Sequence, residues 1–221
     1  MLIEGKLLDV GFGVLMNLRR AKIDITKIEE VYLSHTHSDH IGDFTGLIWA
    51  MQVDGRESPL RVISSQQVAR TVRSVLRLQS TPPGFIKYPV RFVTPKNAGV
   101  SYCGTIHVPQ NSAFRFRFDG VEVVYTGDTA PSEAVADLAK GCDILIHDAT
   151  FLERQKKLAA ITNHSTGQQA ARTAAKCRAR RLVMTHIFPW NEKAEASYLE
   201  EARSEFRGEA IVATDLMEIR V

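Results

Sequence analysis

The sequence HTHSDH, residues 35–40, decides the fold because it places three histidines and an aspartate directly after a strand-like run. The preceding residues IEEVYLS predict a strand and the following residues predict a helix, so the motif connects the two. Residues two apart in an extended chain project to the same face, and His35 and His37 can therefore bind one cation together. Asp39 and His40 then turn towards a second cation.

The mixture of imidazole and carboxylate groups is typical of a catalytic metal site. Neutral imidazoles suit borderline divalent ions, whereas a carboxylate adds negative charge and leaves coordination positions open for water. Three further candidates each follow a predicted strand: His107 in TIHVPQ, Asp128 in VVYTGDT and His186 in RLVMTHIF. Because strand ends aim side chains rigidly, we expect these residues to join the same site.

The rest of the chain alternates predicted strands and helices. A helix over residues 65–78 is expected to be capped by Ser65 and to bury one face, whereas residues 80–112 predict loops with short edge strands. Asp119-Gly120 predicts a type I′ turn between two alternating strands. No Ser/Gly-rich linker divides these elements, so we predict a single domain over residues 1–221 with two layered halves.

The composition indicates a globular protein, with 44% hydrophobic and 24% charged residues. The formal net charge of +3 favours an anionic substrate without identifying one. The cysteines show no CxxC spacing, which argues against a disulfide framework or a zinc-thiolate site and fits a reducing compartment. Neither an apolar leader nor an apolar stretch of about 18 residues is visible, so we expect a cytoplasmic protein without a membrane partner.

The order of the motifs resembles that of the metallo-β-lactamase superfamily, and within it the ribonuclease Z-like branch. The resemblance covers nearly the whole chain. It implies an α+β fold, a four-layer αββα sandwich in which two mixed β-sheets are flanked by helices. The motifs that carry it are LLDVG at residues 7–11, HTHSDH, TIHVPQ, TGDT, HDATF, NHSTGQQAA and THIF.

The resemblance also implies two divalent metal ions as cofactors, which we expect to be zinc, with manganese or iron as alternatives. Asp9 in LLDVG matches the first motif of the family, where we expect a structural role rather than metal ligation. The ligands that the resemblance implies are His35, His37 and His107 for one ion, Asp39, His40 and His186 for the other, and Asp128 as a bridge between them.

Two later motifs, HDATF and NHSTGQQAA, resemble the pair with which the branch places a proton donor near the leaving group. In the family, a Glu of an HEAT motif hydrogen-bonds a downstream His. The matching residues here are Asp148 and His164, and the shorter Asp has less reach. The resemblance implies that His164, steadied by Asp148, donates a proton while Asp39 orients the nucleophile. The alternative is that His164 merely precedes a helix capped by Ser165.

These inferences predict a binuclear metal-dependent hydrolase, in first place a phosphodiesterase acting on cyclic nucleotides or short phosphodiesters. Two cations that share a water lower its pKa and supply a metal-bridging hydroxide to the scissile bond. Ribonuclease Z grips tRNA with an inserted arm, for which the Asp119-Gly120 hairpin leaves no room between His107 and Asp128. Processing of tRNA 3′ ends is therefore the less favoured prediction.

Other functions stay open at this point. The same hydroxide could attack a carbonyl, as in a lactonase or thioesterase, and a promiscuous hydrolase could show weak β-lactamase activity. A non-catalytic nucleic-acid-binding subunit is a further alternative, although we interpret the basic segment KCRARR at residues 176–181 as a solvated helix face. Trp190 is interpreted as a packing residue rather than a stacking platform for bases. The partner we expect is a small anionic substrate, and a homodimer is expected only because relatives commonly form one.

Overall fold

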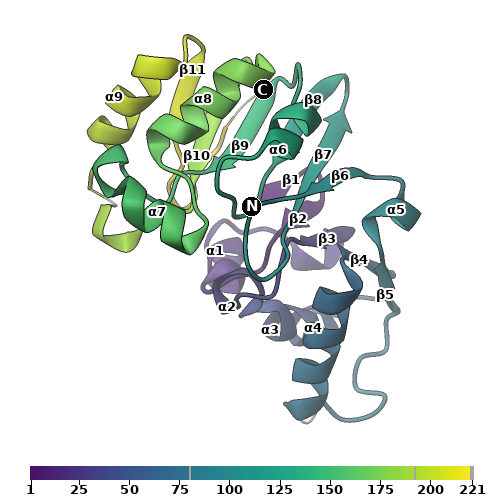
Figure 1. Cartoon of the computed structure of the whole chain (residues 1–221). Helices are drawn as coiled ribbons and strands as arrows, with labels where there is room; N and C mark the ends of the chain where they lie inside the picture. Colours follow the sequence, from purple (N-terminus) through teal and green to yellow (C-terminus); the bar gives the residue numbers. More distant parts are fainter. Residues whose placement is uncertain (80, 192, 220–221) are drawn as a thin grey trace. The chain divides into compact units, whose positions relative to one another are not determined.

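The chain forms two compact units, Met1–Gly99 and Val100–Val221. The computed structural model describes residues 1–79, 81–191 and 193–219. Figure 1 shows that each unit contains one β-sheet with helices beside it. Two halves of similar construction were expected from the sequence, whereas the single domain over residues 1–221 stays a prediction.

The sheet of the first unit is mixed, with strand order β1-β2-β3-β4-β5. Its first two strands pair antiparallel and all later neighbours pair in parallel. The strands are β1 (Leu2–Ile3), β2 (Lys6–Leu8), β3 (Glu30–Leu33), β4 (Leu60–Ser64) and β5 (Val90–Val93). The helices are α1 (Val14–Arg20), η1 (Ile25–Lys27), α2 (Ser38–Ile41), α3 (Phe44–Val53), α4 (Gln66–Leu78) and α5 (Pro95–Ala98).

The core of the first unit is formed by one face of α3 and α4 against the central strands. All four residues of β3 are buried, as expected for a parallel strand inside a sheet. Val68 and Val72 of α4 are buried in the same core, which confirms the apolar face predicted for residues 65–78. The predicted cap is also confirmed, because the Ser65 side chain accepts a hydrogen bond from Val68 N at 3.3 Å.

The sheet of the second unit is also mixed, with strand order β11-β10-β9-β8-β7-β6. The four strands from β8 to β11 are parallel, and β6, β7 and β8 pair antiparallel. The strands are β6 (Ser101–Gly104), β7 (Ser112–Phe118), β8 (Val121–Tyr125), β9 (Ile144–Asp148), β10 (Arg181–Thr185) and β11 (Glu209–Val212). The helices are α6 (Glu133–Leu138), η2 (Glu153–Gln155), α7 (Lys156–Thr162), α8 (Gly167–Cys177), η3 (Pro189–Asn191) and α9 (Glu195–Glu205).

The turn between β7 and β8 has the predicted type I′ character. Asp119 and Gly120 both have positive φ angles, of 48° and 91°, and Phe118 pairs with Val121 across the turn. The prediction of edge strands within residues 80–112 is confirmed as well, since β5 and β6 each lie at one edge of their sheet. Residue 80 itself lies outside the described residues.

Helix α8 begins later than the sequence analysis expected. Its N-cap is Thr166, whose hydroxyl accepts from Gln169 N at 3.2 Å, while the Gln169 side chain accepts from Thr166 N at 2.9 Å. The prediction that Ser165 caps this helix is wrong, because the Ser165 hydroxyl donates to the Thr129 carbonyl at 2.7 Å instead. The segment before α8 is therefore tied to the loop that follows β8.

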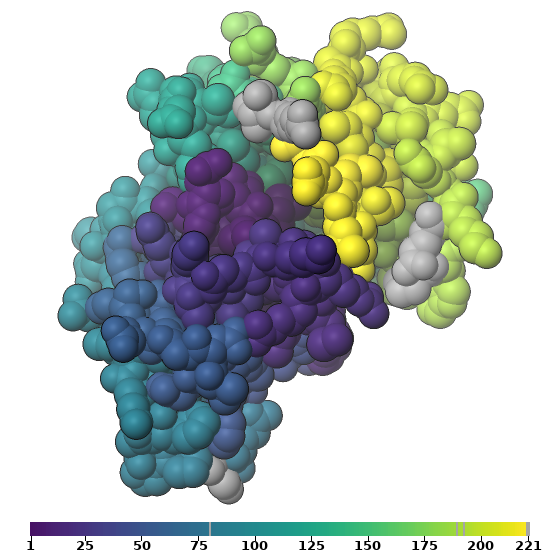
Figure 2. Space-filling view, turned by 180° about the vertical axis from the view of Figure 1, so that it is seen from behind, coloured from purple at the N-terminus to yellow at the C-terminus, as the bar shows by residue number. Residues whose placement is uncertain are grey.

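The surface of the second unit shows one further departure from expectation. Trp190 is 81% exposed, so the prediction that it packs in the core is wrong. Its ring meets that of Phe188 edge-on, with a centroid distance of 4.2 Å. Residues 209–219, which comprise β11 and the described residues after it, belong to the bright yellow band on the surface of this unit in Figure 2. Within the described ranges, no helix has the length and apolar character needed to cross a membrane.

Candidate metal and catalytic site

In the first unit, the HTHSDH motif runs from the end of β3 into α2. His37 is the N-cap residue of α2 and has extended backbone angles, so the chain is still strand-like where the two leading histidines occur. As expected from their spacing, His35 Nε2 and His37 Nδ1 face each other at 3.0 Å. His35 is fully buried, which fixes its ring. Two imidazole nitrogens thus converge on one point.

Asp9 supports the second part of the motif. Its carboxylate accepts hydrogen bonds from Ser34 N and Ser34 Oγ, both at 2.7 Å, and from His40 Nδ1 at 2.8 Å. A carboxylate that accepts from Nδ1–H leaves the other ring nitrogen of His40 with its lone pair available to a metal. That nitrogen, Nε2, lies 3.6 Å from Asp39 Oδ2. These contacts agree with the structural role expected for Asp9.

In the second unit, Asp128 lies in the loop after β8, and the loop is held by buried polar contacts. Asn111 Nδ2 donates to the carbonyl of Asp128 at 2.8 Å and to that of Thr126 at 2.9 Å. Thr105 Oγ1 also donates to the Asp128 carbonyl, at 2.8 Å. The Asp128 side chain is 2% exposed. Its backbone is therefore positioned before any ligand binds.

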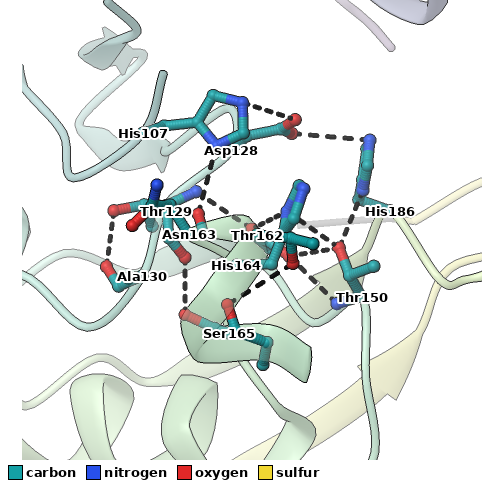
Figure 3. Close-up of polar contacts among 12 residues, drawn as sticks. His107, Asp128, Thr129, Ala130, Thr150, Thr162, Asn163, His164, Ser165 and His186 are labelled. Carbon is teal, nitrogen blue, oxygen red and sulfur yellow. Dashed lines mark hydrogen bonds and ion pairs between the residues drawn. The ribbon is translucent and has the colours of Figure 1, made fainter. Parts of the chain in front are cut away.

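Both carboxylate oxygens of Asp128 face imidazole nitrogens (Figure 3). Asp128 Oδ2 lies 3.7 Å from His107 Nε2, and Asp128 Oδ1 lies 3.5 Å from His186 Nε2. These separations are longer than ordinary hydrogen bonds. Two ligand atoms on a tetrahedral zinc ion are about 3.3 Å apart, given bonds of about 2.0–2.1 Å. The donor set and its spacing therefore fit a divalent ion.

His164 belongs to the same cluster. Single ligand atoms from Asp128, His164 and His186 all lie within 4.8 Å of one another. The rings of His164 and His186 are stacked, with a centroid distance of 5.1 Å and an interplanar angle of 15°. The side chain of His164 is 12% exposed and that of His186 is 28% exposed. Both rings are thus partly accessible to a small ligand.

The expected pairing of Asp148 with His164 is present in spite of the shorter aspartate. His164 Nδ1 donates to Asp148 Oδ2 at 2.8 Å. Backbone contacts compensate for the missing methylene, because Phe151 N bonds to the Ser165 carbonyl and Gly167 N to the Phe151 carbonyl. These bonds draw the segment that carries His164 against the chain that leaves β9. The catalytic role of the pair stays a prediction.

Thr150 is a residue of this site that the sequence analysis did not identify. Its hydroxyl lies 2.7 Å from Asp148 Oδ1, 2.8 Å from His186 Nδ1 and 3.2 Å from His164 Nδ1. A signal for it exists in the sequence, because an Asp followed two residues later by a Thr commonly forms a local side-chain turn. Here Thr150 N donates to Asp148 Oδ1 at 2.9 Å, as that pattern predicts.

His147 is a buried residue of β9 that supports a pH prediction. Its side chain is fully buried in β9, and Nδ1 donates to the Asp148 carbonyl at 2.7 Å. Burial lowers the pKa of His147 below its ordinary value of 6.5. The unfolded chain therefore takes up a proton more readily, and stability is lost as the pH falls below about 6.5.

We expect the free energy of unfolding to fall by about 1.4 kcal/mol from this group for each pH unit below 6.5, until the lowered pKa is reached. Urea unfolding at pH 7.5 and 5.5 measures this effect. The variant His147→Asn keeps a donor near the Nδ1 position but does not titrate, so its stability should fall less over the same interval. An equal fall in both proteins would assign the pH dependence to other groups.

Comparison with known proteins agrees with this arrangement of histidines and aspartates. A family model for the β-lactamase superfamily domain matches residues 7–187. The chain belongs to the metallo-β-lactamase superfamily. It is 31% identical to a ribonuclease Z from Ignicoccus hospitalis, in an alignment that covers 91% of this chain and 84% of that protein. It is 26% identical to a ribonuclease Z from Gemmatimonas aurantiaca, covering 99% and 87% of the two chains.

Solved structures agree with this assignment. The metallo-β-lactamase fold protein YhfI from Bacillus subtilis matches with a TM-score of 0.77 and 25% identity, over 95% of this chain and 84% of that one. The short form of human tRNase Z has the same fold, with a TM-score of 0.78 and 21% identity over 98% and 89% of the chains. The predicted metallo-β-lactamase fold, with two mixed sheets flanked by helices, is thereby confirmed. As a superfamily member of the ribonuclease Z-like branch with a His/Asp cluster, this protein is a metal-dependent hydrolase.

Proposed function

We propose that this hydrolase is a phosphodiesterase acting on cyclic nucleotides or short phosphodiesters. The observation that carries the proposal is the contact of His164 Nδ1 with Asp148 Oδ2 at 2.8 Å, within the cluster that also contains Asp128 and His186. A positioned proton donor matters most when the leaving group is a poor one, such as the alkoxide released from a phosphodiester. A carboxylate-backed imidazole beside metal ligands supplies such a donor.

The proposed cofactors are two divalent ions, in first place zinc. Each unit supports this by the chemistry of its donors, since imidazole nitrogens and carboxylate oxygens face each other in both. Asp128 is the proposed bridge because its two oxygens lie beside two different histidines, each a proposed ligand of a different ion. The proposed ligands are His35, His37 and His107 for one ion and Asp39, His40 and His186 for the other.

The residues of the chain then have separate tasks. Bound ions supply Lewis acidity and a water of lowered pKa. Asp148 holds His164 through Nδ1 and stabilises the doubly protonated ring, whose Nε2–H is free to protonate the leaving oxygen. Asp39, proposed as a ligand, also orients the attacking water. Proton transfer of this kind contributes typically 100- to 10,000-fold to the rate.

Processing of tRNA 3′ ends is the second candidate, and the ribonuclease Z relatives favour it. Two observations favour small substrates instead. The chain between His107 and Asp128 is occupied by β7, β8 and their tight turn, which leaves no inserted arm there. Three of the four basic residues of the segment 176–181 also meet nearby acids, as Lys176 pairs with Glu133, Arg180 with Asp143 and Arg181 with Glu209. These pairs agree with a solvated surface, but the interpretation as a helix face is wrong, because α8 ends at Cys177 and β10 begins at Arg181.

A panel of substrates tests the proposal. Zinc-loaded protein is assayed against bis(p-nitrophenyl) phosphate, a 2′,3′-cyclic nucleotide, a lactone, a cephalosporin and a tRNA precursor with a 3′ trailer. Chelator-treated protein is the control for metal dependence. We expect the two small phosphodiesters to have the highest kcat/KM.

Each contrary result names another function. Preference for the lactone would replace the phosphodiesterase by a lactonase or thioesterase, and preference for the cephalosporin would make β-lactamase activity the main one. If the tRNA precursor had the highest kcat/KM of the panel, processing of tRNA 3′ ends would be the function.

A further inference from the structure

We infer that Thr150 is a positioning residue that links the proposed proton donor to a proposed metal ligand. The inference rests on the proposed function. Figure 3 shows the Thr150 hydroxyl between the side chains of His164 and His186. Because this one oxygen contacts Asp148 as well as His186, the hydrogen bond between Asp148 and His164 and the orientation of His186 depend on each other.

The protons of this network can be assigned from what each group is able to donate. The Asp148 carboxylate only accepts, so the contact with Thr150 Oγ1 at 2.7 Å uses the single hydroxyl proton of Thr150. The Thr150 oxygen can then only accept from His186 Nδ1 at 2.8 Å. His164 donates from Nδ1 as well, chiefly to Asp148 Oδ2. Both histidines therefore carry a proton on Nδ1.

This assignment leaves the Nε2 nitrogens of both rings facing the cluster. For His186, Nε2 is the atom that lies 3.5 Å from Asp128 Oδ1. A hydrogen bond from the other ring nitrogen is how metal-binding histidines are usually held in the required tautomer. His186 has a left-handed backbone, with φ of 59°, directly after β10. The hydroxyl of Thr150 thus fixes the orientation of the His186 ring.

Thr150 is itself held rigidly. Its side chain is buried, with a residue exposure of 2%. The Thr150 carbonyl accepts from Phe188 N and from the Tyr198 hydroxyl, both at 3.0 Å. The Asp148 carboxylate is fixed at its other oxygen by Thr129 N at 2.9 Å. A rigid Thr150 therefore allows the short aspartate to hold His164 and orients His186 at the same time.

Two substitutions separate the hydroxyl from the packing. Thr150→Val removes the hydroxyl and keeps the branched shape, whereas Thr150→Ser keeps the hydroxyl. Thr162→Val is the matched control, because the exposed Thr162 hydroxyl donates to the Leu158 carbonyl at 2.9 Å in α7. The first readout is the tautomer of His164 and His186 in the metal-free full chain, measured by long-range ¹H–¹⁵N correlation and assigned with His164→Gln and His186→Gln.

We expect wild-type protein, Thr150→Ser and Thr162→Val to carry the proton of His186 on Nδ1, and Thr150→Val to lose that preference. The second readout is the dissociation constant of zinc in competition with a chromogenic chelator. Thr150→Val should weaken zinc binding about 10- to 100-fold, the usual cost of removing a group that orients a ligand. Thr150→Ser should restore binding to within about threefold of wild type.

A wild-type His186 that carries its proton on Nε2 would overturn the inference even if the Val variant failed to fold. Unchanged zinc affinity in a folded Thr150→Val protein would overturn it as well. Neither readout uses a substrate. Failure of the phosphodiesterase proposal would therefore leave the tautomer and affinity results standing, and the two failures are distinguishable.

Discussion

Asp128→Asn is expected to lower kcat/KM for bis(p-nitrophenyl) phosphate by roughly 1000-fold or more. The two carboxylate oxygens of Asp128 face His107 and His186 at 3.7 and 3.5 Å, so the proposed bridge uses both. An amide has no negative charge and presents only one oxygen, which removes the bridge while preserving the shape of the side chain. Metal ions contribute several kcal/mol to hydrolysis, and about 1.4 kcal/mol corresponds to a tenfold change in rate.

The zinc content provides the second measurement for this variant. After dialysis we expect about two ions per chain in wild-type protein and at most one in Asp128→Asn, as the proposed bridge implies. Asp137→Asn in α6 is the matched control, since this aspartate is exposed and outside the cluster. If Asp128→Asn kept its full zinc content and its activity stayed within about threefold of wild type, Asp128 would not be a metal ligand.

Much of the local structure follows from patterns in the sequence that reflect backbone chemistry. Asp119 and Gly120 tolerate positive φ angles, and this tolerance predicts the turn between β7 and β8. Val68 and Val72 are four residues apart, close to the 3.6-residue period of a helix, and this spacing predicts the buried face of α4 in the same way. Such features depend on residues that are close in the chain. They can therefore be predicted from short stretches of the sequence.

The contacts of the site depend on residues that are distant in the chain, and these were less predictable. The motif match indicated that Asp148 and His164 pair, but the backbone bonds between Phe151 and the segment before α8 explain why a short Asp suffices. Thr150 was missed because its partner His186, directly after β10, is distant in the sequence. Ser165 was the wrong cap because its hydroxyl bonds to the distant Thr129 carbonyl, while Thr166 forms the capping contacts with Gln169.

His164→Ala is expected to lower kcat for a phosphodiester with an alkoxide leaving group by about 100- to 10,000-fold while zinc binding is retained. The reason is that the ring, held by Asp148 at 2.8 Å, supplies a proton to the leaving oxygen rather than electrons to a metal. A p-nitrophenolate leaving group needs little protonation. The same variant should therefore lose much less activity towards bis(p-nitrophenyl) phosphate than towards a 2′,3′-cyclic nucleotide.

The comparison of the two substrates decides between two roles that the geometry of His164 allows. A proton donor predicts unequal losses and an unchanged zinc content. The ligand atoms of His164, Asp128 and His186 lie within 4.8 Å of one another, so a metal ligand is the competing role. That role predicts equal losses on both substrates together with release of zinc.

Asp148→Asn sharpens the test, because it removes the charge that stabilises the protonated ring but leaves His164 in place. Under the proton-donor role it should reproduce the unequal losses in weaker form with an unchanged zinc content. If His164 were a metal ligand, removing the group that orients it would weaken zinc binding and lower activity on both substrates alike.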